Sequence, residues 1–226
     1  MRWEANRLRE TLANARVMLI FTPELTGERD ALTILESILP WVDMIQVRPK
    51  PVGAADGGPT EARAARDWCR AVLERVATCE RPLPVLVNDR VDVAHLLADE
   101  GLAGVHLGQT DCPWQEAREQ LGPDLLIGLS THDVTQVAQA LDAKVDYLGF
   151  GPVFPTATKG FERGVSPETT WVASQASEVP LFPIGGISPA NAQELSHIGR
   201  AAVGSALLAS EDPAGAARAV RGLLER

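Results

Sequence analysis

The sequence predicts a single (β/α)8 barrel, because eight short apolar runs alternate with helix-like segments along its 226 residues. The runs are continuous and rich in Val, Ile and Leu, as expected for strands buried on both faces of a parallel sheet. Eight strand–helix units in a chain of this length favour a compact barrel. An open doubly wound sheet is the alternative, but that fold usually has about six strands.

The apolar runs define the expected strands. In chain order they are Val17–Thr22, Asp43–Arg48, Pro84–Asn88, Gly104–Leu107, Leu125–Ser130, Val145–Phe150, Leu181–Ile184 and Ala201–Gly204. The helix-like segments include Pro59–Val76, Val91–Ala98, Val134–Leu141, Pro189–His197 and Pro213–Leu224. Ser188 and Pro189 are predicted to be the N-cap and first residue of one of these helices. All lie in one domain spanning residues 1–226, with a helical N-terminal extension over 1–16 and a loop over 51–59.

Composition narrows the classes of function. The net charge of −9 argues against a general nucleic-acid or anionic-membrane partner, because both bind basic surfaces. A few local cations can still bind a small anionic substrate. The three cysteines have no metal-like spacing and the first residues do not resemble a signal peptide, so we expect a protein of the reducing cytoplasm. Small molecules are the expected partners, and a homo-oligomer is left open.

Candidate site residues are sought at the C-terminal ends of the strands, where barrel enzymes carry their active sites. The second strand ends in Gln46, Arg48 and Lys50. Residues two apart point the same way along an extended chain, so these three side chains can face one anion. An ordinary solvated strand end is the alternative.

Two carboxylates follow the next two strands. Asp89 follows the third strand, and Asp111 follows the fourth. A pair of carboxylates with room for water is how proteins usually hold Mg2+, with substrate phosphate completing the shell. Each aspartate alone could instead cap the helix that follows it. Their joint position beside a cationic strand end favours a metal site.

The fifth and sixth strands add further polar residues. Ser130 can donate a hydrogen bond to an anion or cap the next helix. His132 is a candidate ligand or acid/base, although a lone histidine is more often structural. The loop Gly151–Gly164 contains hydroxyl side chains and Lys159, which suit closure over phosphates. An ordinary mobile loop is the alternative.

Glycine turns follow the last two strands. Gly185 and Gly186 end the seventh, and Gly204 and Ser205 end the eighth. Glycines let backbone N–H groups approach an anion, and the loops after strands seven and eight form the recurrent phosphate site of such barrels. A cationic pocket and a pocket of backbone N–H groups are thus expected at the same end of the barrel. Together they predict a transferase with two phosphorylated substrates.

Taken in order, these motifs resemble thiamine-phosphate synthase over residues 17–225. The motifs are Gln46-x-Arg48-x-Lys50, Val87-Asn88-Asp89-Arg90-Val91-Asp92, Gly104-Val105-His106-Leu107-Gly108-Gln109-x-Asp111, Gly128-x-Ser130-x-His132, Gly149-x-Gly151-Pro152-x-Phe154-Pro155-Thr156-x-Thr158-Lys159 and Ile184-Gly185-Gly186-Ile187. Each motif is weak alone, but the ordered set is specific. The sequence departs from the family pattern in four places. Pro49 replaces a usually acidic residue and Gly204 a usually apolar one, the helix after Asp92 is longer (His95–Leu102), and the segment Ile198–Ala202 is shortened.

The resemblance implies a (β/α)8 barrel that uses Mg2+. Such an enzyme joins 4-amino-2-methyl-5-(diphosphooxymethyl)pyrimidine to 4-methyl-5-(2-phosphooxyethyl)thiazole, giving thiamine phosphate and diphosphate. Carried across by motif, Asp89 and Asp111 would bind Mg2+, and Arg48, Lys50, Ser130 and Lys159 would be catalytic. The pyrimidine diphosphate would contact Gln46, Val47, Arg48, Pro49, Lys50, Asn88, Ser130 and Lys159. The thiazole phosphate would contact Thr156, Ala157, Thr158, Gly186, Gly204 and Ser205.

Three other functions compete with this one. The nearest is a thiazole tautomerase of the same barrel family, with His132 as acid/base, but a tautomerase has no diphosphate to bind. A non-catalytic phosphate-ligand sensor need not activate a leaving group. A phosphosugar isomerase would explain Gly185 and Gly186 but not the paired carboxylates. Formation of thiamine phosphate from the two substrates separates these alternatives.

Overall fold

The sheet closes into a barrel. A computed structural model describes residues 3–50, 59–155 and 164–225. Its parallel strands lie in the order β7-β6-β5-β4-β3-β2-β1-β8, and an isolated bridge between Ile184 and Ala202 joins the two ends of that order. The strands are β1 (Val17–Phe21), β2 (Met44–Val47), β3 (Val85–Asn88), β4 (Gly104–Leu107), β5 (Leu126–Thr131), β6 (Tyr147–Phe150), β7 (Leu181–Pro183) and β8 (Ala201–Val203). The prediction of a (β/α)8 barrel is confirmed.

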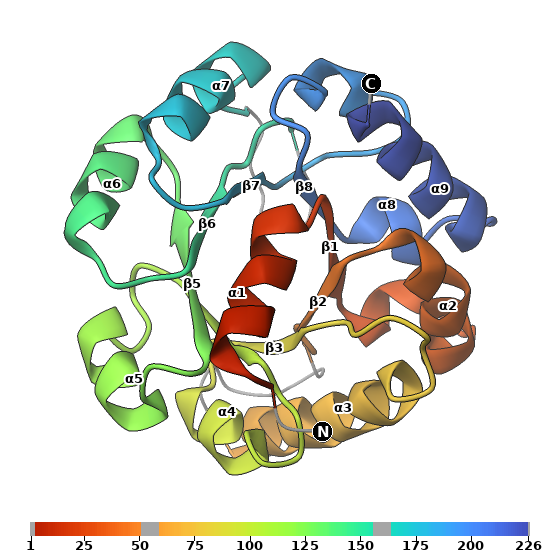
Figure 1. Ribbon diagram of the computed structural model, residues 1–226. Coiled ribbons are helices and arrows are strands. Elements are labelled where there is room, and N and C mark those ends of the chain that lie inside the picture. Colours follow the sequence, from red (N-terminus) through yellow and green to blue (C-terminus); the bar gives the residue numbers. More distant parts are fainter. Residues whose placement is uncertain (1–2, 51–58, 156–163, 226) are drawn as a thin grey trace.

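Helices surround the strands (Figure 1). They are α2 (Ala31–Ile38), α3 (Pro59–Val76), α4 (Val91–Leu97), α5 (Trp114–Leu121), α6 (Val134–Gln139), α7 (Pro167–Ala176), α8 (Ser205–Leu208) and α9 (Pro213–Leu224). A further helix, α1 (Ala5–Asn14), lies across one end of the barrel, where the sequence predicts an N-terminal helix. None of the described helices is long and apolar enough to cross a membrane.

One predicted helix is wrong. Within the described segment 164–225, β7 is followed by the short 3-10 turn η5 (Ala192–Leu195) and not by a helix over Pro189–His197. The Asn191 side chain accepts a hydrogen bond from the Ser188 N–H at 2.8 Å and donates one to the Gly186 carbonyl at 2.9 Å. These bonds hold the backbone in a tight turn, because Asn side chains compete with helical hydrogen bonding.

Alternate strand residues face opposite sides of the barrel wall. One set, including Val47, packs against the surrounding helices in a large outer core. The other set points into the barrel, where Met18, Leu86 and Phe182 form an inner core together with Leu8 of α1. Because side chains alternate along a strand, the inward positions at the C-terminal strand ends lie above this apolar floor. Polar residues occupy those positions.

Partly buried carboxylates join the strands at the opposite, N-terminal end. Asp43 accepts a hydrogen bond from the Val17 N–H at 3.0 Å and pairs with Arg221 of α9 at 2.9 Å. Asp146 likewise accepts from the Ile127 N–H at 2.8 Å and pairs with an arginine of α5. Burial alone would raise the pKa of Asp43, but these hydrogen bonds outweigh burial and lower it below the usual carboxyl value. This end of the barrel is therefore built for stability.

Candidate active site

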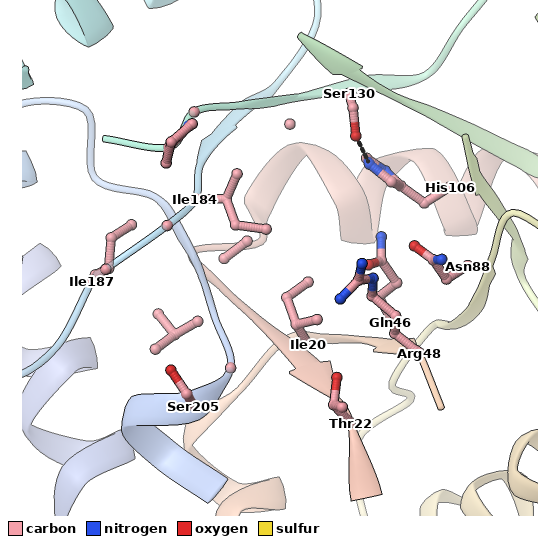
Figure 2. Close-up of a pocket in the computed structure, with 18 of the residues that line it drawn as sticks. Ile20, Thr22, Gln46, Arg48, Asn88, His106, Ser130, Ile184, Ile187 and Ser205 are labelled. Carbon is pink, nitrogen blue, oxygen red and sulfur yellow. Dashed lines mark hydrogen bonds between the residues drawn. The ribbon is translucent and has the colours of Figure 1, made fainter. Parts of the chain in front are cut away.

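A cavity opens at the C-terminal ends of the strands (Figure 2). Arg48, Gln46 and Asn88 gather at one side of the view, and Ser205 and Ile187 lie at the other. Further lining residues come from every part of the ring and include Ile20, Thr22, His106, Ser130, Thr131, His132, Gly149, Gly151, Ile184, Gly186, Ala202 and Gly204. The structure thus brings together seven of the predicted substrate-binding residues, namely Gln46, Arg48, Asn88, Ser130, Gly186, Gly204 and Ser205.

The end of β2 supplies the cationic side of the cavity. Gln46 is buried, and the half-buried Arg48 points into the cavity beside it. Burial lowers the pKa of the Arg48 guanidinium, but the charges of Asp89 and Asp111 oppose that shift. Arg48 therefore stays charged, as arginine does in proteins. Lys50 is exposed at the end of the described segment.

Two predicted contacts from this strand do not line the cavity. The Val47 side chain lies in the outer core and is fully buried there. Pro49 is buried as well, and it is not among the lining residues. Alternation explains both, because these residues occupy the outward positions between Gln46, Arg48 and Lys50.

The carboxylates of Asp89 and Asp111 come together beside the cavity. Burial raises the pKa of Asp89 to about 7, and a hydrogen bond and charge repulsion from Asp111 add to that shift. Neither aspartate caps a helix, since α4 begins after Arg90 and α5 after Pro113 without side-chain caps. The capping alternative is therefore wrong. Two partly buried acids held together form a site that a cation would stabilise.

Local backbone geometry holds the two carboxylates in place. Asp89 has the left-handed φ of 61°, a conformation that Asp tolerates better than most residues. The Asn88 side chain donates a hydrogen bond to its carboxylate. The Asp111 carboxylate accepts from the Gly108 N–H at 2.6 Å, and a Cβ at Gly108 would lie 2.7 Å from the same oxygen. The described residues contain no cluster of three or more His, Cys, Asp or Glu, so a bound Mg2+ would complete its shell with water or substrate oxygens.

Ser130 faces the cavity from β5 and does not cap α6. That role falls to Asp133, whose side chain accepts from the Gln136 N–H. The Ser130 hydroxyl instead lies 2.9 Å from Nε2 of His106, and the dashed line in Figure 2 marks this bond. His106 stands in one of the quoted motifs, but the sequence assigned it no role. Its inward-facing position at the end of β4 could have identified His106 as a candidate site residue.

His132 also lines the cavity. Its Nδ1 lies 2.6 Å from the Gly151 carbonyl oxygen, so this ring nitrogen carries a proton and donates it to the carbonyl. The ring thereby fixes the start of the segment that follows β6. Thr156, Ala157, Thr158 and Lys159 lie outside the described residues.

Glycines form the opposite side of the cavity, where other parts of the backbone approach them closely. Gly186 has a φ of 66°, and a Cβ there would lie 2.5 Å from the Pro155 carbonyl and 2.8 Å from Phe154 Cβ. A side chain at this position would therefore strike the chain after β6. Gly204 precedes α8 and approaches Ile20 of β1, with 3.2 Å between its ideal Cβ and the Ile20 carbonyl.

These features define a (β/α)8 barrel with a polar-lined cavity at its C-terminal strand ends, where barrel enzymes carry their active sites. Residues 17–207 match the sequence model described as thiamine monophosphate synthase. The chain belongs to the thiamine monophosphate synthase family.

Individual relatives agree with this assignment. A thiamine-phosphate synthase from Mycobacterium sp. (strain KMS) is 44% identical over 189 residues, covering 81% of this chain and 80% of the relative. One from Synechococcus sp. (strain WH7803) is 37% identical and covers 97% of this chain, but the chain spans only 60% of that relative's length. The solved thiamine phosphate pyrophosphorylase from Pyrococcus furiosus is 28% identical with a TM-score of 0.76, covering 96% and 98% of the two chains.

Proposed function

We propose that this protein is a thiamine-phosphate synthase. It would join 4-amino-2-methyl-5-(diphosphooxymethyl)pyrimidine to 4-methyl-5-(2-phosphooxyethyl)thiazole, giving thiamine phosphate and diphosphate. Family membership supports the proposal. The observation that carries it is the carboxylate pair of Asp89 and Asp111 beside Arg48, because a metal-bound diphosphate requires this arrangement. An isomerase or tautomerase has no use for it.

The reaction needs no nucleophile or general base from the protein. The C–O bond between the pyrimidine methylene and the diphosphate breaks, and its electron pair leaves with the diphosphate. The methylene cation is stabilised by the amino group of the pyrimidine ring. The lone pair of the thiazole nitrogen then forms the new C–N bond, so atoms and electrons balance without a proton transfer.

The protein's task is to stabilise the departing diphosphate and to hold both rings in one dry cavity. Arg48, Lys50 and Lys159 would bind the developing negative charge, which is electrostatic catalysis. Mg2+ held by Asp89 and Asp111 would neutralise part of the same charge. Gln46, Asn88 and Ser130 would orient the pyrimidine substrate. Thr156, Ala157, Thr158, Gly186, Gly204 and Ser205 would bind the thiazole phosphate at the opposite side.

His132 keeps a thiazole tautomerase as a second candidate, because its ring lines the cavity and its Nδ1 is fixed by the Gly151 carbonyl. That geometry leaves Nε2 as the nitrogen that could exchange a proton with a substrate. The tautomerase function does not account for Asp89 and Asp111. The two functions also differ in stoichiometry, since only the synthase consumes a pyrimidine diphosphate.

One experiment tests the proposal. Purified protein is incubated with both substrates and Mg2+, and thiamine phosphate and diphosphate are quantified by chromatography. We expect equal amounts of the two products, with loss of activity in EDTA and in Asp89→Asn. Asp124→Asn is the matched control, because it makes the same chemical change at an exposed position near the start of β5. Activity that persists in EDTA would remove Mg2+ from the proposal, and isomerised thiazole formed without pyrimidine would favour the tautomerase.

We also propose that the enzyme works in the cytoplasm on these small molecules. The net charge of −9 and the three free cysteines support this setting. A homo-oligomer remains compatible with the sequence. Fractionation of cells tests the cytoplasmic location, and light scattering of the purified protein tests the oligomeric state.

A further inference from the structure

A line of hydrogen-bonded side chains runs from the barrel interior to the floor of the cavity. The Tyr147 hydroxyl lies 3.0 Å from Nδ1 of His106, and Nε2 of the same ring lies 2.9 Å from the Ser130 hydroxyl. Tyr147 is fully buried and His106 is 7% exposed. The Gln46 side chain, from β2, acts on the Tyr147 hydroxyl and lowers the pKa of the phenol. Four strands thus contribute one residue each to a connected line that ends in the cavity.

The barrel interior is shaped to hold the two rings in fixed positions. A Cβ at Gly128 would lie 2.1 Å from the Tyr147 ring, so no other residue fits beside it. A Cβ at Gly149 would lie 3.2 Å from Cε1 of His106. Phe182 packs edge-on against Tyr147 with 5.8 Å between ring centroids. Because the rings are confined on several sides, the hydrogen bonds between them are preorganised.

The direction of these hydrogen bonds follows from the chemistry of each group. Burial raises the pKa of the Tyr147 phenol, so the phenol keeps its proton and needs an acceptor. The Gln46 side chain opposes that shift, as expected when its amide N–H is directed at the phenol oxygen. The phenol O–H is then donated to Nδ1 of His106. A neutral imidazole has one donor and one acceptor, so Nε2–H must donate to the Ser130 oxygen.

We propose that Tyr147 and His106 are positioning residues that make Ser130 a hydrogen-bond donor toward the pyrimidine diphosphate. With its oxygen occupied by Nε2–H, the Ser130 hydroxyl directs its own proton into the cavity. Among the described residues it has no other side-chain partner, so an acceptor atom of the substrate is the expected one. The substrate in this inference rests on the proposed function, whereas the hydrogen-bond line itself does not.

The tautomer of His106 gives a test that needs no substrate. In 15N-labelled protein, two-bond 1H–15N correlations report which ring nitrogen carries the proton, and His106→Gln identifies the signal among the four histidines. We expect a neutral ring protonated at Nε2. Tyr147→Phe, which removes only the hydroxyl, should give a mixture of tautomers. A wild-type ring protonated at Nδ1 would overturn the inference, whether or not the protein makes thiamine phosphate.

Kinetics test whether the line acts through Ser130. Tyr147→Phe should lower kcat/KM for the pyrimidine diphosphate about tenfold, the value of one hydrogen bond, with the thiazole KM unchanged. In a Ser130→Ala background the same change should have less than about a twofold effect. His106→Gln should retain more activity than His106→Asn, because the longer amide can place its N–H where Nε2–H lies.

The controls separate positioning from damage to the fold. Ser177→Ala removes a hydroxyl that donates to the Val179 carbonyl at 2.8 Å, near the start of β7, and should leave kinetics unchanged. The Tm of each variant is measured alongside. If Tyr147→Phe lowered kcat/KM equally in the wild-type and Ser130→Ala backgrounds, the inference would be refuted. If wild-type protein has no synthase activity, calorimetric affinity for the pyrimidine diphosphate replaces the kinetics, and unaltered affinity in Tyr147→Phe would again refute it.

Discussion

The Asp89–Asp111 pair implies that a residue proposed to bind the catalytic metal lowers the stability of the fold. Burial of Asp89 and its contact with Asp111 raise the pKa of its carboxyl to about 7, so the folded protein disfavours the ionised form. We expect Asp89→Asn to abolish activity and yet to raise the free energy of unfolding at pH 8 in EDTA. The amide keeps nearly the same shape and carries no charge, which relieves the repulsion by Asp111.

The sign and size follow from proton linkage. An aspartate in an unfolded chain has a pKa of about 3.9. Between about pH 4 and pH 7 the folded state therefore holds a proton that the unfolded state has lost, and stability falls as pH rises, by up to about 1.4 kcal/mol per pH unit. The loss is complete above pH 7, with an upper limit of about 4 kcal/mol. Solvent screening and the neighbouring Arg48 reduce it, so we expect about 1–3 kcal/mol.

Urea denaturation at pH 5 and pH 8 measures this effect. In EDTA at pH 8, Asp89→Asn should have a higher free energy of unfolding than wild type. The difference should be smaller at pH 5, where wild-type Asp89 is largely protonated. Added Mg2+ should stabilise wild type and leave the variant unchanged, and Asp124→Asn should match wild type throughout. A variant less stable than wild type at pH 8, or a difference independent of pH, would refute the reasoning.

Three further predictions concern other parts of the structure. Arg48→Ala should cost about 2–4 kcal/mol of transition-state stabilisation, seen as a fall in kcat with little change in Tm, and a change in KM alone would show uniform binding. Asp43→Ala should lower the free energy of unfolding by about 3 kcal/mol, because the Val17 N–H loses its acceptor and Arg221 keeps only the more exposed Glu225 as an ion-pair partner. The pKa of Asp43 is lowered in the folded protein, so the contribution of its carboxylate to stability is complete above the unfolded pKa of about 3.9. This contribution disappears as pH falls through the folded pKa. Urea denaturation of wild type and Asp43→Asn should therefore show a stability difference that shrinks at acidic pH. Gly186→Ala should raise the KM for the thiazole more than the KM for the pyrimidine, because the new Cβ pushes against Pro155 at that side of the cavity. Equal increases in both KM values would contradict this prediction.

Local patterns in the sequence predicted the strands and the residues at their ends. The Gly104–Leu107 strand was predicted to the residue, because a continuous apolar run between polar ends has few other structures open to it. Period-two alternation placed Gln46 and Arg48 on one side of β2. The order of the predicted strands placed Asp89 and Asp111 after neighbouring strands, and parallel strands end at the same edge of the sheet.

Features that depend on long-range contacts could not be predicted in this way. The bond between His106 and Tyr147 joins residues 41 apart, and it exists because of the stagger of strands around the barrel. The need for glycine at Gly186 comes from the approach of Pro155, which no local pattern encodes. The failed helix after β7 has a local cause, but the Asn191 side chain could equally have pointed to solvent.

The join between β7 and β8 has a consequence for how the barrel moves. Neighbouring strands elsewhere share continuous ladders, whereas in the described chain this join rests on the bridge between Ile184 and Ala202. Local opening of a fold begins where the fewest hydrogen bonds must break. Amide exchange should therefore be fastest, among the strands, along the facing edges of β7 and β8. Gly186 and Gly204 follow these two edges, so the side of the cavity proposed to bind the thiazole phosphate should widen and narrow while the Arg48 side stays rigid.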